Sequence, residues 1–326
     1  MAGVLLLALT AGGLVTYKTS AALAVIAKAQ TLGTMAPKAA WISGAHVPLW
    51  VRPLADAVSY FAWVGIALGF GLLLGAVVRA AVSERALRSF AAGGASGHLW
   101  AAVAGAPLML CSCCVAPLFD GVFARTRRLG PSLALMLAAP GLNPAAMVLT
   151  FMLFPADLAM SRLVLALSIV LGVSSALGRL PGASDSVACQ LEPTREAGFV
   201  RALSRSLRDV VLRTLPAIGL GVLASALLLQ LVPIQSLGAG GDGVALPLAV
   251  LVALLVALPT FGEVPIALAL LAAGASHSVA LGVLVAGPIV NLPSLLTLRK
   301  TVSTRAAVAT GLSVYMVTVA GSALLA

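Results

Sequence analysis

The sequence predicts an all-α polytopic membrane protein that contains two inverted-topology repeats, each with a re-entrant helical hairpin and a broken transmembrane helix. Three observations lead to this prediction: an apolar composition, apolar runs of membrane-spanning length, and prolines and asparagines that recur at a fixed spacing. Of the 326 residues, 61% are hydrophobic and 9% are charged, and the mean hydropathy is +1.10. A chain with so little polar surface cannot cover a water-soluble globule of this size.

The charge balance is basic, with 20 Lys and Arg against 10 Asp and Glu. In a soluble protein such an excess would suggest a nucleic-acid partner, but here the basic residues lie in short loops between apolar runs. Basic loops of this kind determine the orientation of a membrane protein. We therefore expect the lipid bilayer as a partner and no nucleic acid.

Apolar runs of about 20 residues predict membrane-spanning helices, because a helix rises about 1.5 Å per residue through a hydrocarbon core about 30 Å thick. The N-terminal stretch lacks the basic region of a cleaved signal peptide, so we expect it to be a retained first helix. The other predicted spans are 59–82, 131–154, 157–180, 209–232, 276–298 and 305–325.

Two further apolar regions, 97–125 and 243–274, read as pairs of half-length arms with a break between them. The second arms, 115–124 and 264–273, have about ten residues each, which is roughly half the thickness of a bilayer. We interpret both regions as re-entrant hairpins whose tips lie near the membrane midplane. Two full crossings in each region would leave the topology unchanged.

The basic residues predict a cytoplasmic N-terminus, because this orientation places 15 of the 20 on the cytoplasmic side. The remaining five would lie outside or near the outer edge: Lys18, Lys28, Lys38, Arg52 and Arg162. One long polar connection divides the chain. The predicted organisation is an N-terminal helix and external loop (1–58), a first repeat (59–180), a polar cytoplasmic linker (181–208) and a second repeat (209–326).

The two halves resemble each other at an offset of 148 residues. This offset places Pro117 on Pro265, APGLNP on GPIVNLP, and CSCCVAP on PTFGEVP. Each half holds an odd number of crossings, so the repeats must be inverted. Inverted repeats with broken helices are typical of secondary transporters, whose substrate sites lie near the midplane where the helices are interrupted. The alternative is that the prolines only kink packed helices. The predicted break and tip residues are Pro117, Pro140, Pro144, Pro265 and Pro288.

The first tip carries the cysteine cluster Cys111, Cys113 and Cys114. We expect Pro117, and Pro265 in the second half, to open the second half-helix, so that free N–H groups and a positive dipole end face each tip. Thiols are ligands for soft metals and metalloids. The alternatives are that the cysteines pack as small hydrophobic residues or that Cys113 and Cys114 form a strained vicinal disulfide. Cys189, in the polar linker, is interpreted as an ordinary free thiol.

Only two of the ten acidic residues, Asp120 and Glu263, fall inside the hairpins. An ionisable group within a bilayer is a functional candidate, and Glu263 could carry a coupling proton or balance a cationic substrate. Asp120 is the weaker candidate for proton coupling, because Arg125, Arg127 and Arg128 lie close in sequence and predict a structural ion pair.

Two asparagines, Asn143 and Asn291, flank the breaks and could bond either freed backbone groups or a substrate. Thr260 and Ser112 are weaker members of the same site. The three histidines, His46, His98 and His277, are scattered and predict no metal site.

The order CSC, a nearby proline and LAAPGLNP, followed in the second half by VPIALALLAAGASHSVALGVLVAGPIVNLPSLLTLRK, resembles the ArsP-type predicted permeases. The resemblance extends from about residue 59 to the end of the chain. It implies a bacterial inner-membrane permease, and some members of the family export trivalent organoarsenicals such as methylarsenite. The cysteine motif of the family falls on Cys111 and Cys113, with Cys114 as an additional thiol. Ser294 stands where the family commonly has an acidic residue.

Together these observations predict a permease that exports a soft metalloid or another thiol-reactive small solute by alternating access, with a cysteine-containing site at the midplane. No cofactor is expected. The first alternative is a membrane subunit of a two-component permease, and a homo-oligomer is also compatible with the sequence. The second is a membrane thiol oxidoreductase, against which the absence of a recognisable cofactor motif argues. An enzyme is therefore not predicted.

Overall fold

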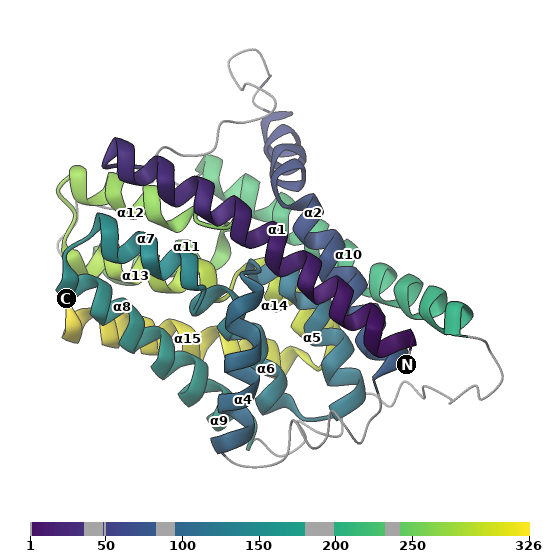
Figure 1. Ribbon diagram of the computed structural model, residues 1–326. Helices are drawn as coiled ribbons and strands as arrows, with labels where there is room; N and C mark the ends of the chain where they lie inside the picture. Colours follow the sequence, from purple (N-terminus) through teal and green to yellow (C-terminus); the bar gives the residue numbers. More distant parts are fainter. Residues whose placement is uncertain (1, 36–47, 49, 83–94, 180–198, 232–241) are drawn as a thin grey trace.

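The chain is helical throughout the part that the computed structural model describes, residues 2–35, 48, 50–82, 95–179, 199–231 and 242–326 (Figure 1). After α1 (Ala2–Leu32), the first half consists of α2 (Arg52–Ala81), α4 (Ala95–Gly105), η2 (Ala106–Leu108), α5 (Ser112–Thr126), α6 (Leu129–Gly141), α7 (Pro144–Leu153), α8 (Ala156–Ser168), the π-helical turn η3 (Ile169–Val173) and α9 (Ser174–Leu177). The second half consists of α10 (Phe199–Leu231), α11 (Asp242–Leu255), α12 (Glu263–Ala272), α13 (His277–Ile289), α14 (Leu292–Thr301) and α15 (Thr304–Leu325).

Five helical segments of the described residues are long and apolar enough to cross a membrane, and two bent pairs, α6 with α7 and α13 with α14, raise this number to as many as seven. These segments correspond to the seven predicted spans. Two helices begin earlier than expected. Helix α2 starts at Arg52, and α10 starts at Phe199, so its first residues belong to the stretch predicted to be a polar linker. A multi-pass membrane protein is confirmed.

The sequence repeat reappears in the bounds of the helices. A shift of 148 residues, the difference between Leu129 and His277, carries α6 onto α13 and α7 onto α14. The same shift carries the continuous segment 156–177 onto α15. Both bent pairs turn by 40° at their breaks. The two halves therefore share an order of elements, while their inverted orientation stays a prediction.

At each break, one of the two asparagines noted in the sequence caps the start of the following helix. Asn143 accepts hydrogen bonds from the backbone N–H groups of Ala145 and Ala146, at the start of α7. Asn291 accepts one from the N–H of Ser294, whose hydroxyl accepts one from the N–H of Asn291. These bonds satisfy donors that a helix start leaves free. The two asparagines thus hydrogen-bond backbone groups freed at the breaks.

Four of the five predicted prolines lie near helix ends. Pro140 and Pro288 are the penultimate residues of α6 and α13, and Pro144 is the first residue of α7. Pro265 lies in the first turn of α12, which begins two residues earlier at Glu263. Pro144 and Pro265 cost little, because the N–H that each lacks has no partner within the first turn of a helix, whereas Pro140 and Pro288 lie in the last turn, next to the breaks.

The prediction that Pro117 opens its half-helix is wrong. Helix α5 begins at Ser112, with Cys111 as its N-cap, and Pro117 lies inside the helix. Because proline has no N–H, the carbonyl of Cys113 loses its donor from the next turn. The cysteine cluster, rather than the proline, therefore forms the start of α5.

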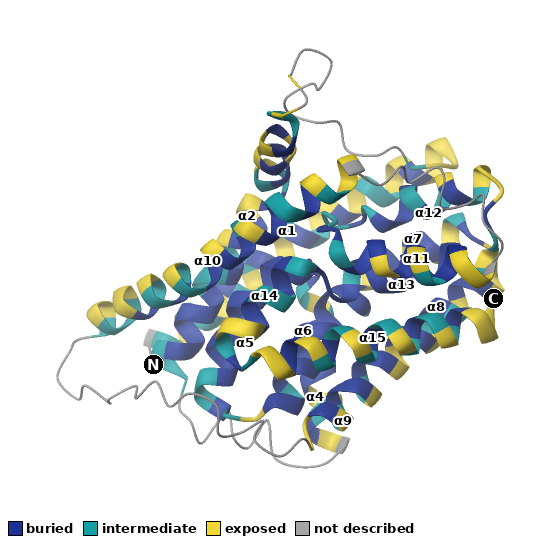
Figure 2. Cartoon of the chain, turned by 180° about the vertical axis from the view of Figure 1, so that it is seen from behind, coloured by how far each residue is buried: buried dark blue, intermediate teal, exposed yellow. Residues whose placement is uncertain are grey.

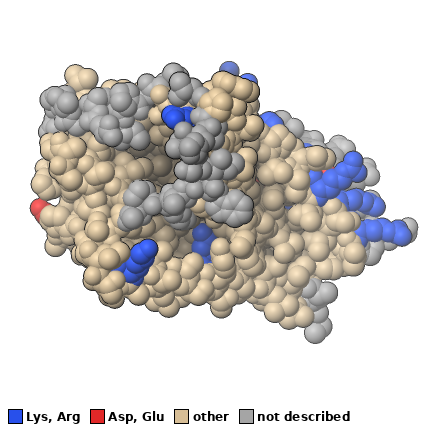
Figure 3. All heavy atoms as spheres, turned by 90° about the horizontal axis from the view of Figure 1, so that it is seen from above, with Lys and Arg blue, Asp and Glu red and all other residues tan. Residues whose placement is uncertain are grey.

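The two sides of the helices differ in burial. Buried residues face the interior, while α10 and α15 expose apolar side chains such as Leu220 and Met316 outward (Figure 2). Most of the surface in Figure 3 is uncharged, and the largest group of Lys and Arg lies at the end where α10 begins. An apolar outer surface of this kind suits contact with lipid. The core of the first half depends on close contact between α2 and α5, where Gly75 leaves no room for a methyl group beside the Pro117 carbonyl.

Candidate functional site

The candidate site lies where the two hairpin tips meet. The first tip, residues 109–111, joins η2 to α5, and the second tip, residues 256–262, joins α11 to α12. Each contains a non-glycine residue with left-handed backbone, Met109 at φ 50° and Phe261 at φ 71°. Such conformations are uncommon outside glycine and mark functional regions. The side chains of Met109 and Phe261 belong to one apolar cluster with Ala22 and Ala29 of α1, so the tips and the N-terminal helix pack together.

A small cavity lies between the tips and the two breaks. Its volume is about 10 Å³, close to the minimum that holds one water molecule. One wall is formed by Cys111 and Asn143 of the first half, and the facing wall by Thr260 and Glu263 of the second. Leu110, Leu258, Pro259, Phe261 and the break prolines Pro140 and Pro288 complete the lining. We call this the tip cavity.

The cysteine cluster is buried and compact. Cys113 and Cys114 are fully buried, Cys111 nearly so, and all three are free thiols. The Sγ atoms of Cys111 and Cys113 lie 3.2 Å apart, those of Cys113 and Cys114 lie 3.8 Å apart, and all three lie within 4.8 Å of one another. This spacing allows the sulfurs to coordinate one soft atom together. Only Cys111 reaches the tip cavity, and the other two lie behind it in α5.

Helix α2 connects the cluster to a second, larger cavity. The hydroxyl of Tyr60 lies 2.9 Å from the sulfur of Cys113. Tyr60 also lines a cavity of about 260 Å³, with Asp56 and Trp63 from the first part of α2, Ser225 and Leu229 from the last part of α10, and Leu258 and Pro259 from the second tip. We call this cavity the vestibule. Leu258 and Pro259 line both cavities, so the second tip is the partition between them.

Glu263 is buried and ion-paired. Its Oε1 lies 3.0 Å from a guanidinium nitrogen of Arg162 in α8, which also donates to the hydroxyl of Thr150 in α7. The side chain of Arg162, which we expected outside or near the outer edge of the membrane, is buried inside the protein, with 1% of it exposed. A buried charge needs a partner, and this arginine is the partner that the sequence reasoning missed.

A second basic residue, Lys18, is also buried. Lys18 lies in the middle of α1, is 8% exposed, and donates a hydrogen bond of 3.1 Å to the hydroxyl of Thr260 at the second tip. The N-terminal helix therefore contributes to the site. A lysine in the middle of a mostly apolar 31-residue helix is a signal that could have identified it.

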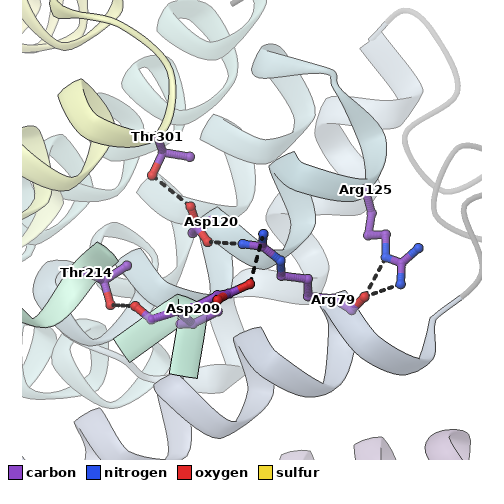
Figure 4. Close-up of polar contacts among 7 residues, drawn as sticks. Arg79, Asp120, Arg125, Asp209, Thr214 and Thr301 are labelled. Atoms are coloured by element: carbon purple, nitrogen blue, oxygen red, sulfur yellow. Dashed lines mark hydrogen bonds and ion pairs between the residues drawn. The ribbon is translucent and has the colours of Figure 1, made fainter. Parts of the chain in front are cut away.

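Asp120 forms an ion pair, but not with the arginines expected from sequence. Its Oδ2 lies 3.2 Å from Arg79 in α2, and its Oδ1 accepts a hydrogen bond of 3.0 Å from Thr301 (Figure 4). Arg79 also lies 3.8 Å from the half-exposed Asp209. Arg125 instead donates to the backbone carbonyl of Arg79. Asp120 therefore joins α2, α5 and α14 at a distance from the tip cavity lining.

The remaining candidates divide between the cavity and the core. Asn291 is fully buried, does not line the tip cavity, and its Nδ2 has no hydrogen-bond partner among the described residues. Ser112 is buried in the first turn of α5. His98 is half-buried in α4 and His277 is exposed at the start of α13, so these two do not form a site. Cys189 and His46 lie outside the described residues.

Comparison with known proteins identifies the family. A family model described as a predicted permease, of the ArsP type, matches residues 54–326. The chain belongs to the ArsP-type predicted permease family. The permease is also 31% identical over 284 residues to the UPF0718 protein YraQ of Escherichia coli strain K12, a match that covers 85% of this chain and 82% of that protein. No solved structure matches it. Membership of this family favours transport over a membrane enzyme.

Proposed function

We propose that this permease exports a soft metalloid or another thiol-reactive small solute, of the organoarsenical type, by alternating access through the tip cavity. One observation carries the proposal: the two hairpin tips and the two helix breaks meet at one small cavity, which Cys111 lines from one half and Glu263 from the other. Sites at interrupted helices between repeats are typical of secondary transporters.

The thiols would capture a trivalent arsenical by exchange. Methylarsenite, CH₃As(OH)₂, reacts with two thiols to give CH₃As(SR)₂ and two molecules of water. Two As–S bonds replace two As–O bonds, each leaving hydroxyl group takes the proton of one thiol, and no oxidant or reductant is needed. Cys111 and Cys113, whose sulfurs are 3.2 Å apart, are the pair best placed for this exchange, and Cys114 is a third donor.

Transport requires the tip cavity to open, because about 10 Å³ cannot hold such a solute. The vestibule reaches the other side of the partition formed by Leu258 and Pro259. In the proposed orientation, with the N-terminus in the cytoplasm of a bacterial inner membrane, the start of α2 and the end of α10 face outward. Displacement of the second tip would then connect the cavity with the outside.

Glu263 is proposed as the site of proton coupling. A proton that reaches its carboxylate removes the ion pair with Arg162, so protonation is linked to separation of α12 from α8. This link would couple the titration of one side chain to the movement of the second tip.

Uptake of methylarsenite into everted membrane vesicles tests the proposal. We expect Cys111→Ser and Cys113→Ser to abolish uptake while the protein inserts at its normal level, and Cys189→Ser, outside the cluster, to transport normally. Wild-type uptake by both cluster variants would remove the cysteines from the mechanism. Equal uptake by vesicles with and without the permease would refute the proposed substrate.

A further inference from the structure

Lys18 is a buried basic residue that no carboxylate balances among the residues that the structure describes. Three basic side chains are buried in helices of the described residues, and two of them, Arg79 and Arg162, are paired with carboxylates. Within the described residues no carboxylate lies in ion-pair distance of Lys18, whose recorded partner is the neutral hydroxyl of Thr260. An unbalanced cation inside a membrane protein is costly and marks a functional position.

The position of Lys18 relates it to the tip cavity. Thr260, its hydrogen-bond partner, lines this cavity together with Cys111. Lys28, in the same helix, is exposed, and α1 lies before the residues matched by the family model. The N-terminal helix therefore brings a charge to a site built by the family core.

The other polar groups of the tip cavity also offer hydrogen-bond donors or positive charge. The Oδ1 of Asn143 is occupied by the N–H groups of Ala145 and Ala146, which leaves its amide Nδ2 as a donor at the cavity wall. Three helices, α5, α7 and α12, begin at residues that line the cavity or adjoin them, and helix starts carry partial positive charge. The single acidic group of the lining, Glu263, is neutralised by Arg162. Donors and positive charge thus dominate this site.

We propose that Lys18 adapts the tip cavity to an oxyanion of a soft element, a solute whose soft atom exchanges one hydroxyl group for one cysteine sulfur, so that the hydroxyl group leaves as water with the thiol proton. The negatively charged oxygens that the solute keeps would face Lys18, Thr260 and Asn143. The proposal rests on the site described under the proposed function and names the charge of the solute that it takes. An anion would supply the charge balance that Lys18 lacks, and the thiol wall and the donor wall would each bind one part of it.

Charge-selective thiol reagents test this inference. The full-length permease, purified in lipid nanodiscs, is treated with the anionic sulfonatoethyl methanethiosulfonate and the cationic trimethylammonioethyl methanethiosulfonate, and the rate of modification of Cys111 is followed by peptide mass spectrometry. We expect the ratio of the anionic to the cationic rate to fall at least about tenfold in Lys18→Met, as the loss of a nearby charge in a low-dielectric site requires. Lys18→Arg should keep the wild-type ratio.

Lys28→Met is the matched control, because it removes a charge from the exposed side of the same helix, and it should keep the wild-type ratio. If Lys18→Met fails to insert, Lys18→Gln provides the same measurement with a hydrogen-bonding side chain. If Lys18 acted only in packing, its replacement would change the rates of the anionic and the cationic reagent by the same factor. An unchanged ratio of the two rates in Lys18→Met would therefore overturn the inference. So would a wild-type Cys111 that neither reagent modifies, because no charged solute would then reach it.

The two proposals fail separately in these experiments. The reagent ratio measures the potential at Cys111 and needs no transport, whereas vesicle uptake measures export. A normal fall in the ratio together with absent methylarsenite uptake would retain the charged site and reject the arsenical substrate. Normal uptake with an unchanged ratio would do the opposite.

Discussion

The two tips share a backbone plan but differ in their chemistry. Each passes through one left-handed residue into the start of a helix, and each packs against α1. The first tip presents thiols, linked to α2 by Tyr60, and the buried ion pair of Asp120 lies further along α5. The second presents Thr260 and Glu263, each bound to a basic side chain from another helix.

This difference indicates that the two halves share the backbone shape of their tips but not the side chains that could bind a solute. Soft ligands face charged and hydrogen-bonding groups across one cavity. A solute that contacts both walls has to carry a soft atom and a polar group. The two walls also depend on different interactions, and the following variants distinguish them.

The largest effect is expected on the second wall. Arg162→Met would leave the carboxylate of Glu263 buried without its partner, at a cost of about 3–5 kcal/mol. We expect a large fall in the midpoint of thermal unfolding of the detergent-purified permease. The control is the double variant Arg162→Met with Glu263→Gln, which removes both charges and should recover most of the loss. A single variant as stable as the wild type would show that the ion pair does not hold this tip.

An intermediate effect is expected behind the first wall. Gly75→Ala places a methyl group against the backbone of Pro117 in α5, and we expect a loss of about 1–3 kcal/mol, because a packed core resists an added methylene. The matched control is Gly69→Ala, because an added Cβ at Gly69 meets no atom of another helix within 4 Å. We expect this variant to be neutral or slightly stabilising, because alanine favours a helix more than glycine does. Unfolding in graded detergent mixtures compares the two. Equal stability of both variants would contradict close α2–α5 packing.

The sequence predicted the scaffold better than the contacts of the site. Helix positions, the breaks at Asn143 and Asn291 and the repeat follow from local composition and spacing, which are written in consecutive residues. The partners Arg162 and Lys18 lie on other helices, 101 and 242 residues from Glu263 and Thr260. Such pairs depend on how the helices pack against each other. A single sequence does not distinguish a basic residue exposed in a loop from one that is buried beside a partner. Proximity along the chain misled the assignment for Asp120 in the same way.

The smallest effect should come from Tyr60→Phe, which removes only the hydroxyl that contacts Cys113. Loss of one buried hydrogen bond costs about 1 kcal/mol, so the permease should insert and remain folded. Tyr60 connects the cysteine cluster to α2 at the vestibule wall. We therefore expect the affinity of the permease for a trivalent arsenical probe, phenylarsenite, to change severalfold, while the stability of the second tip does not change.

The double variant Tyr60→Phe with Arg162→Met tests whether the two walls are independent. The two losses of stability should add, because Tyr60 and Arg162 share no hydrogen-bond partner among the described residues. A large coupling energy would instead show that the two walls respond as one unit, as a cavity that opens by concerted movement of both tips requires.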